Sequence, residues 1–339
     1  MITEEKKGDP VTGPNRWRTV VLIALVTLLT AEVGARVAEP LLETPLRWPT
    51  AQIAQKADQI RQLAAEGASI DVVFLGSSVV ALGIDPIEFN EADGLVAYNA
   101  GLNGAAVSGL ERWAFDVVLP QLQPTVVVIG LTTRDLNDHG RLSADFLQSM
   151  EITDGWKDFE ERNPFERFID AVQDSSALVR IRPLLRTPTT TVRHALRGNG
   201  DPGLEAGPFG SEGEPSTIPY DPEAWTSLWA IDHLNDYSMG GQELAALDQL
   251  LTRLNSEGFE VVLAKMPVLP EYLSVLPGGA GALAEFRQAV QEIASAHNVE
   301  ILIPEAEFGP SDFRDPAHLN LDASGEFAAS LREHLASQR

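Results

Sequence analysis

The sequence contains no cysteine in its 339 residues. The chain therefore has no disulfide bond, no thiolate zinc site and no cysteine nucleophile. The same absence is compatible with a reducing or an oxidising compartment. Any covalent catalysis by this chain must use another nucleophilic side chain.

Basic residues are also few, because 25 Lys and Arg stand against 49 Asp and Glu, for a net charge of −24. Nucleic-acid binding needs clustered cations that neutralise phosphates, so we expect no nucleic-acid partner. An anionic membrane surface is an equally poor partner for this charge. The acidic excess is most simply explained as a solvated surface.

The chain also lacks sequence motifs for metals and nucleotides. Five histidines show no metal-ligand spacing, and we interpret them as surface residues: His139, His194, His233, His297 and His334. The stretch GLNGAAVSG has its glycines at 101, 104 and 109, which is not the dinucleotide-binding spacing, and no P-loop is present. We therefore expect no metal and no cofactor.

One long apolar run lies near the N-terminus. Residues 19–31 carry no charge, and continuing to residue 38 gives a helix long enough to span a bilayer, provided that Glu32 and Arg36 lie near the interface. Basic residues precede the run, and the positive-inside rule then places the N-terminus in the cytoplasm: Lys6, Lys7, Arg16 and Arg18.

Three interpretations of this run stay open: an uncleaved signal-anchor, a signal peptide cleaved near residues 33–35, and a soluble helix. We favour the first, a single-pass protein of the cell membrane. The second would give a secreted protein. Both place the body of the chain outside the cytoplasm.

The domain boundaries follow from composition. We expect a cytoplasmic segment at 1–18, a transmembrane signal-anchor at 19–38 and a proline-containing linker at 39–50. A single domain then covers 51–339, with an insertion at about 142–237. The insertion includes the stretch GNGDPGLEAGPFGSEGEPS, which has too few apolar residues to pack.

Short apolar runs alternate with amphipathic helical patterns over the rest of the chain. The runs predict strands at 71–76, 95–101, 125–130, 259–267 and 299–304. The helical patterns cover 51–67, about 105–121, 241–258, 282–297 and about 322–337. This alternation predicts an α/β fold, a three-layer α/β/α sandwich around a five-stranded parallel sheet.

Polar residues follow these strands, at the edge of a parallel sheet where ligands bind. Ser77 and Ser78 follow the first strand, and Asp315 precedes His318 by three residues just before the last helix. A carboxylate so placed could orient an imidazole while the other ring nitrogen takes a proton from a serine. A simpler interpretation also stays open, in which the two serines only cap the helix that follows them.

These residues lie in three stretches that resemble the SGNH or GDSL family of serine hydrolases: FLGSSV, YNAGLNGA and DPAHLN. The resemblance implies a flavodoxin-like fold and a catalytic triad of Ser78, His318 and Asp315. It also implies that the backbone N–H groups of Ser78 and Gly101 bind the oxyanion. Ser77 takes the place of an aspartate that is common in the family, and we expect it to shape the turn.

The third block of the family, Gly-x-Asn-Asp, is replaced here by a run that begins at Gly130 and continues LTTRDLND. Thr132 is the candidate oxyanion donor in register, whereas Arg134 or Asn137 would need a longer loop. Asn103 and Arg134 are candidate substrate-binding residues. The residues from 132 to 135 could equally form a structural ion-pair and capping cluster.

The apolar N-terminal helix, the GSS block and the stretch PVLPEYLSVLP resemble the membrane-anchored branch that acts on acyl groups of cell-envelope polymers. The resemblance implies an extracytoplasmic serine esterase or O-acyltransferase, acting through an acyl-enzyme on esters, acetyl esters above all, of a polysaccharide. The expected partners are an acylated carbohydrate or small ester, the membrane, and a membrane-bound acyl donor protein. The alternative is a catalytically silent protein of the same fold that binds or assembles polysaccharide.

Overall fold

The computed structural model describes residues 16–38, 50–91, 94–139, 175–180, 206–211, 230, 233–234, 236–303 and 307–337. Most of the expected linker and insertion therefore lies outside the described residues. The chain divides into two compact units, one of Met1–Pro45 with Glu161–Gly200 and one of Leu46–Glu160 with Asp201–Arg339. The domain boundaries expected from composition stay a prediction.

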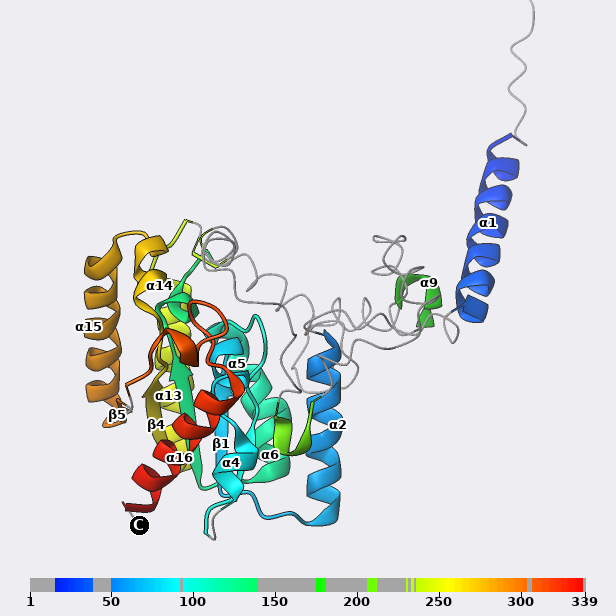
Figure 1. Ribbon diagram of the computed structural model, residues 1–339. Helices are drawn as coiled ribbons and strands as arrows, with labels where there is room; N and C mark the ends of the chain where they lie inside the picture. The colour runs from blue at the N-terminus through cyan, green and yellow to red at the C-terminus, as the bar shows by residue number, and fades with distance from the viewer. Residues whose placement is uncertain are drawn as a thin grey trace, which may run out of the picture. The chain divides into compact units, whose positions relative to one another are not determined.

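Five strands form one sheet in the larger unit, in the order β2-β1-β3-β4-β5 (Figure 1). They are β1 (Val72–Gly76), β2 (Ala97–Asn99), β3 (Val126–Leu131), β4 (Glu260–Lys265) and β5 (Glu300–Leu302). Every pairing between them is parallel. The predicted five-stranded parallel sheet is confirmed, although β2 and β5 are shorter than the runs that predicted them.

Chain order reverses beside β1, because β2 lies on one side of this strand and β3 on the other. Such a reversal opens a crevice at the carboxyl ends of the two central strands. At that end Gly76 pairs with Gly130, and Gly130 pairs with Ala264. A row of small residues thus leaves room for other groups at the end of the sheet.

Helices cover both faces of the sheet. Those with buried residues on one face are α2 (Thr50–Glu66), α5 (Val107–Arg112), η1 (Trp113–Val118), α6 (Leu119–Leu122), α13 (Gln242–Glu257) and most of α15 (Gly279–His297). The other face holds α3 (Ser78–Ala81), α4 (Pro86–Asn90), α14 (Pro270–Val275) and α16 (Leu321–Ser337). The shorter turns are η2 (Thr133–Leu136), η4 (Pro208–Gly210) and η5 (Pro310–Asp312).

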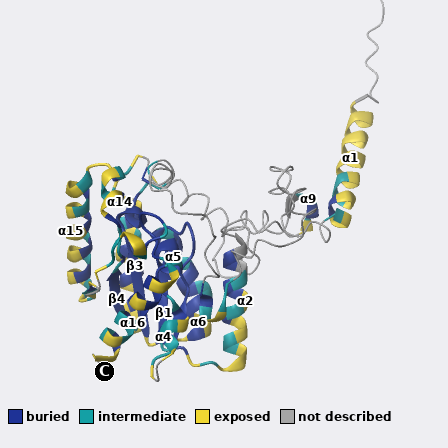
Figure 2. Cartoon of the chain, viewed as in Figure 1, coloured by how far each residue is buried: buried dark blue, intermediate teal, exposed yellow. Residues whose placement is uncertain are grey.

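Strand alternation divides the core between these two layers. Val73 and Leu75 face the first helix layer, whereas Val72 and Phe74 face the second. All five residues of β1 are buried, which explains why the strand reads as a continuous apolar run rather than an alternating one (Figure 2). The three-layer α/β/α architecture is therefore confirmed.

The smaller unit contains α1 (Arg16–Ala38) and the short α9 (Ala177–Arg180). Within α1, Trp17–Ala38 is long and apolar enough to cross a membrane or to be a signal sequence, with a mean hydropathy of 2.0. Glu32 pairs with Arg36 at 2.9 Å and also accepts hydrogen bonds from the Ser176 hydroxyl and the Ala177 amide. The two charges in the apolar helix thus compensate each other and bind the start of α9.

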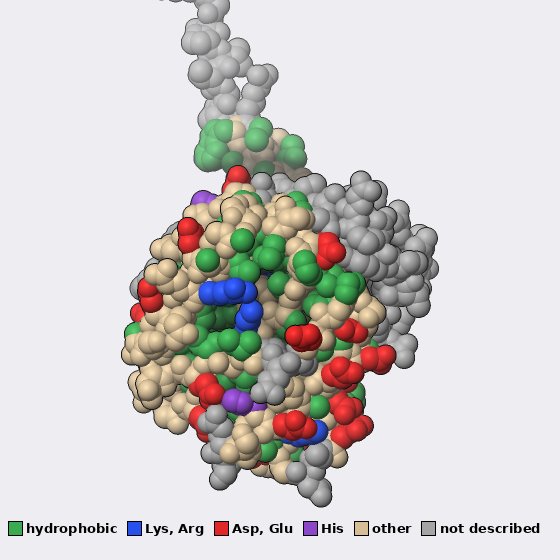
Figure 3. Space-filling view, turned by 60° about the vertical axis from the view of Figure 1, so that its left-hand side comes forward, with side chains coloured by type: hydrophobic (Ala, Val, Ile, Leu, Met, Phe, Trp, Pro, Cys, Tyr) green, Lys and Arg blue, Asp and Glu red, His purple; other side chains and the backbone are tan. Residues whose placement is uncertain are grey.

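Acidic side chains are more widespread than basic ones on the face shown in Figure 3. They lie at several places on the larger unit, in contact with solvent. This arrangement agrees with the interpretation of the acidic excess as a solvated surface.

Candidate active site

The end of β1 delivers Ser78 to the edge of the sheet. A side chain at Gly76 would meet Val80 Cγ2 at 2.3 Å and the carbonyl oxygen of Gly130 at 2.8 Å, so only glycine fits. A side chain at Gly130 would meet the same Val80 methyl at 2.4 Å. The two glycines therefore let α3 begin directly after the strand, with Val80 packed on the sheet and Ser78 in its first turn.

The two serines have different surroundings. Ser77 occupies the N-cap position of α3 but makes no side-chain capping hydrogen bond. Its hydroxyl is buried and has no hydrogen-bond partner among the described residues. The Ser78 hydroxyl instead contacts His318, and neither serine caps the helix through its side chain.

His318 lies in the loop between η5 and α16. An antiparallel bridge between Phe313 and Leu319 closes this loop, and the Arg314 amide donates to the His318 carbonyl oxygen at 3.0 Å. The Leu269 amide, beyond the end of β4, donates to the Pro316 carbonyl oxygen at 2.8 Å. The loop is thereby held against the carboxyl end of the sheet.

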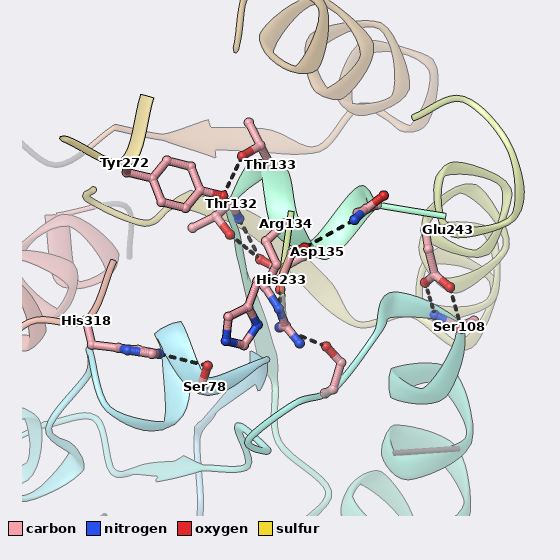
Figure 4. A network of polar contacts seen from close by, with 12 residues as sticks. Ser78, Ser108, Thr132, Thr133, Arg134, Asp135, His233, Glu243, Tyr272 and His318 are labelled. Carbon is pink, nitrogen blue, oxygen red and sulfur yellow. Dashed lines mark hydrogen bonds and ion pairs between the residues drawn. The ribbon is translucent and has the colours of Figure 1, made fainter. Parts of the chain in front are cut away.

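Ser78, His318 and Asp315 form one hydrogen-bonded chain, of which Figure 4 shows the contact between Ser78 and His318. Ser78 Oγ lies 2.8 Å from His318 Nε2, and His318 Nδ1 lies 2.6 Å from Asp315 Oδ2. The other carboxylate oxygen accepts the amides of Ala317 and His318, each at 3.0 Å. Serine and histidine are 240 residues apart in sequence, and the fold brings them within hydrogen-bond distance of each other.

Asp315 is held in its charged form. Burial by itself raises the pKa of this carboxyl, but the adjacent His318 ring and the hydrogen bonds from Ala317 and His318 outweigh it and lower the pKa below its ordinary value. Ser78, His318 and Asp315 are each less than one-tenth exposed. A buried carboxylate paired with an imidazole, whose other nitrogen faces a hydroxyl, can draw the hydroxyl proton onto the ring.

The amide of Gly101, an expected oxyanion donor, already has an acceptor inside the structure. It donates to Asn99 Oδ1 at 2.9 Å and is therefore occupied by an internal hydrogen bond. A side chain at Gly101 would meet the Ala81 nitrogen at 2.5 Å, so the glycine is explained by close packing against α3. Binding of an oxyanion by the Gly101 amide stays a prediction.

Thr132, the expected side-chain donor, is also engaged in internal hydrogen bonds. Its amide and its hydroxyl both donate to Asp135 Oδ2, at 2.7 and 2.8 Å. The hydroxyl proton is therefore committed to Asp135. Thr133 is engaged as well, because its hydroxyl shares a 2.7 Å hydrogen bond with Tyr272, whose pKa burial raises above the usual range.

Arg134 and Asn103, the candidate substrate-binding residues, are both buried. Arg134 Nη1 donates to the Ala105 carbonyl oxygen and to Asp135 Oδ1, at 3.1 Å each. The backbone amide of Asn103 donates to Gln52 Oε1 at 2.8 Å, and the side-chain oxygen Oδ1 of Asn103 has no hydrogen-bond partner among the described residues. Binding of substrate by either residue stays a prediction.

Asn137 and Asp138 attach a distant segment to the end of β3. Asn137 Nδ2 donates to the His233 carbonyl oxygen at 3.1 Å, and Asn137 Oδ1 accepts the Ser238 amide at 3.0 Å. The Asp138 carboxylate accepts the amides of Gly241 and Glu243, at 2.8 and 2.9 Å. The polar run after Gly130 therefore holds the chain that enters α13.

This attachment brings His233 into the site, which contradicts its interpretation as a surface residue. Its ring is half-buried and lies between Arg134 and the Ser78–His318 pair (Figure 4). Burial first, then the positive charge of Arg134 and the His318 ring, lower the pKa of His233 to about 2, against the opposing effect of Asp315. Nothing in the surrounding sequence, IDHLND, marks this histidine as part of a site.

Lys56 is a second residue that the sequence did not reveal. It is fully buried on α2, and its ammonium donates to the carbonyl oxygens of Asn99 and Gly101, at 3.0 and 2.8 Å. Asn99 in turn donates to the carbonyl oxygens of Val80 and Ile84, at 2.9 and 2.7 Å. Helix α2, the loop after β2 and helix α3 are thus joined by one buried polar network next to Ser78.

Within the residues that the structure describes, no group of three or more His, Asp and Glu side chains could hold a metal ion.

Comparisons with known proteins give similarities at low identity. A carbohydrate acetylesterase from Sinorhizobium meliloti is 11% identical, with 80% of this chain and 100% of that chain covered and a TM-score of 0.40. A GDSL-like lipase from Bacteroides thetaiotaomicron is 11% identical, with 84% and 100% covered and a TM-score of 0.39. An esterase from Pseudoalteromonas sp. is 13% identical, with 79% and 97% covered and a TM-score of 0.37.

No family model and no curated protein matches this chain. The hydrogen-bonded chain of Ser78, His318 and Asp315 is a property of this structure by itself.

Proposed function

We propose that this protein is an extracytoplasmic serine esterase or O-acyltransferase that acts on acyl esters, acetyl esters above all, of a cell-envelope or extracellular polysaccharide. One observation carries the catalytic part of the proposal, the 2.8 Å contact between Ser78 Oγ and His318 Nε2 with Asp315 on the opposite ring nitrogen. This arrangement activates a hydroxyl that is otherwise a weak nucleophile.

The reaction follows from this geometry. Ser78 Oγ attacks the acyl carbonyl carbon while His318 Nε2 accepts the hydroxyl proton, which gives a tetrahedral oxyanion and an imidazolium held by Asp315. The intermediate collapses to acyl-Ser78, and His318 returns the proton to the departing alcohol. Water then completes hydrolysis by the reverse sequence, whereas a sugar hydroxyl in its place completes acyl transfer.

Backbone amides are available for the oxyanion in this scheme. Among the described residues, the amides of Ser78 and Gly104 have no hydrogen-bond acceptor, unlike that of Gly101. Gly104 lies in the same loop as Gly101 and has a φ of 78°, a conformation that favours glycine. We therefore assign the backbone part of the oxyanion hole to Ser78 and Gly104.

The location and the substrate class rest on other features. The apolar helix Trp17–Ala38 and the basic residues before it support a membrane anchor with the N-terminus inside. The resemblance of the GSS block and of the stretch after β4 supports a polymeric acyl ester and a membrane-bound acyl donor protein. A secreted form that has lost the helix would keep the same site.

Activity on p-nitrophenyl acetate tests the catalytic proposal. We expect Ser78-dependent release of p-nitrophenol, abolished in Ser78→Ala and retained in the matched variant Ser77→Ala. A rate in Ser78→Ala equal to that of the wild type would contradict the proposal. Release of acetate from an acetylated polysaccharide, compared with acetyl transfer to a deacetylated one, then separates hydrolysis from transfer.

A second candidate function is a catalytically silent polysaccharide-binding or assembly protein. It is favoured by the internal hydrogen bonds that occupy two of the three expected oxyanion donors, Gly101 and Thr132. Polysaccharide binding that survives Ser78→Ala and His318→Ala, together with no turnover of any acyl ester, would select this function over the enzyme.

A further inference from the structure

The position of His233 is set by the end of β3. Three hydrogen bonds join Asn137 and Asp138 to His233 and Ser238, including one from the Asp138 amide to the Ser238 carbonyl oxygen at 2.9 Å. Two more from Gly241 and Glu243 hold the start of α13 on the Asp138 carboxylate. Because the anchoring side chains follow a central strand of the sheet, the His233 backbone is placed with respect to Ser78 by the core of the fold.

The groups around the His233 ring are those of the proposed catalytic centre. Its electrostatic interactions include those with Arg134, His318 and Asp315, and in Figure 4 its ring lies between the Arg134 side chain and the Ser78–His318 pair. Arg134 is itself fixed by Ala105 and Asp135. In this view the positively charged Arg134 side chain lies on the side of the His233 ring that faces away from Ser78 (Figure 4).

Such surroundings keep the ring neutral at the pH values at which His318 must act as a base. A neutral imidazole beside a reacting carbonyl polarises it by donating an N–H, and it adds no second base to compete for the Ser78 proton. The Arg134 charge both disfavours protonation of this ring and increases the polarity of its N–H.

The side chains that were expected to supply a donor are engaged elsewhere. The Thr132 hydroxyl donates to Asp135, and the side-chain amide of Asn137 donates to the His233 carbonyl oxygen. We propose that His233 is the side-chain donor of the oxyanion hole, binding the substrate carbonyl oxygen as it becomes the oxyanion, and that Arg134 positions and polarises it. This inference rests on the proposed function and adds a residue to its site.

Steady-state kinetics with p-nitrophenyl acetate test the inference. His233→Phe keeps an aromatic ring but removes the donor, and we expect kcat to fall about 100-fold with KM within about threefold of wild type. His233→Asn restores a donor on a shorter side chain and should recover at least tenfold of that loss. His334→Phe, in the last turn of α16 and on a ring that contacts Glu300, is the matched control and should keep the wild-type kcat.

Arg134 has its own prediction, because it acts through His233. Arg134→Gln should lower kcat without raising KM, and Arg134→Lys should restore part of the rate because it keeps the charge. In the His233→Phe background the Arg134→Gln exchange should have little further effect, since its target is gone. A purely structural role of Arg134 would instead give additive losses in the two backgrounds.

Three outcomes would overturn the inference: wild-type kcat in His233→Phe, a loss confined to KM, or equal losses in His233→Phe and His233→Asn. If His233→Phe does not fold, His233→Leu repeats the comparison at a smaller volume. Labelling with a fluorophosphonate separates this inference from the proposed function. Wild type that shows neither Ser78 labelling nor turnover overturns both, whereas a Ser78-dependent His233→Phe enzyme with full activity overturns the role of His233 alone.

Discussion

The environment of His233 predicts a specific acid sensitivity of the folded protein. The pKa of this ring is 6.5 as a reference and about 2 in the folded state, chiefly because of burial and then because of Arg134 and His318. Below pH 6.5 the imidazole of His233 therefore binds a proton in the unfolded chain but stays neutral in the folded chain. Stability is unaffected by this group above pH 6.5 and is progressively lost as the pH falls from there towards 2.

The size of the effect follows from the difference between the pH and the reference pKa of the imidazole. At pH 5 the unfolded imidazole is almost fully protonated, about 1.5 units below its reference value, so the folded state loses about 2 kcal/mol relative to pH 7. For a domain of this size such a loss lowers Tm by roughly 4 to 8 °C. His233→Asn lacks the titrating ring and should be spared this part of the acid destabilisation.

Urea unfolding at pH 7 and pH 5 measures the effect as a difference between proteins. The free energy of unfolding should fall by about 2 kcal/mol more in wild type than in His233→Asn. His334→Gln removes a partly exposed ring that is paired with Glu300, and this variant should behave as wild type. Equal falls in wild type and His233→Asn would refute the reasoning that the ring is held neutral.

Four further predictions concern the rest of the molecule. Asp315→Asn should leave a folded protein with kcat reduced about 10⁴-fold in the p-nitrophenyl acetate assay, because the ring loses the carboxylate that stabilises its charged form, and a fall of less than tenfold would contradict this. Lys56→Met leaves two buried carbonyl oxygens without their donor, and urea unfolding should show a loss of about 2 kcal/mol, whereas an unchanged midpoint would show that the network adds nothing. Gly101→Ala forces a methyl group against the Ala81 nitrogen and should cost about 1 to 3 kcal/mol by the same assay, unless α3 can move away. Ala336→Cys introduces the sole thiol of the chain on α16, and a membrane-impermeant maleimide should label it in intact cells, an outcome that a cytoplasmic body would not give.

The strands and the turn that places Asp315 beside His318 could be predicted because their signals are local. The run from 71 to 76 is continuously apolar since both faces of β1 are buried, and Asp315 with His318 forms a turn whose spacing is visible in the sequence. Parallel topology then places the carboxyl end of β1 and the loop before α16 at the same edge of the sheet. These features required no knowledge of which side chains contact each other.

The sequence could not show which of the expected oxyanion donors are engaged in internal hydrogen bonds, because hydrogen-bond partners are decided in three dimensions. Gly101 and Thr132 occupy the expected positions. The Gly101 amide nevertheless donates to Asn99, and the Thr132 hydroxyl donates to Asp135, which the motif does not include. A donor's availability depends on competing acceptors such as Asn99 and Asp135, and a sequence pattern carries no information on that competition.

His233 and Lys56 escaped prediction for a related reason. Lys56 lies on α2 among residues whose spacing suggests only an amphipathic helix, and its burial depends on two carbonyl oxygens from another segment. His233 reaches the site through Asn137 and Asp138, almost one hundred residues earlier in the chain. The polar run after Gly130 departs from the third block of the family, and in the structure its Asn137 and Asp138 anchor this segment.

The identity of the acylated residue tests the central claim most directly. Mass spectrometry of peptides from protein quenched in acid during turnover of p-nitrophenyl acetate should find an acetyl group on Ser78 in wild type and in Ser77→Ala. It should find none in Ser78→Ala. Acetylation of Ser77 instead, or turnover that persists with Ser78 unmodified and replaceable by alanine, would contradict the account.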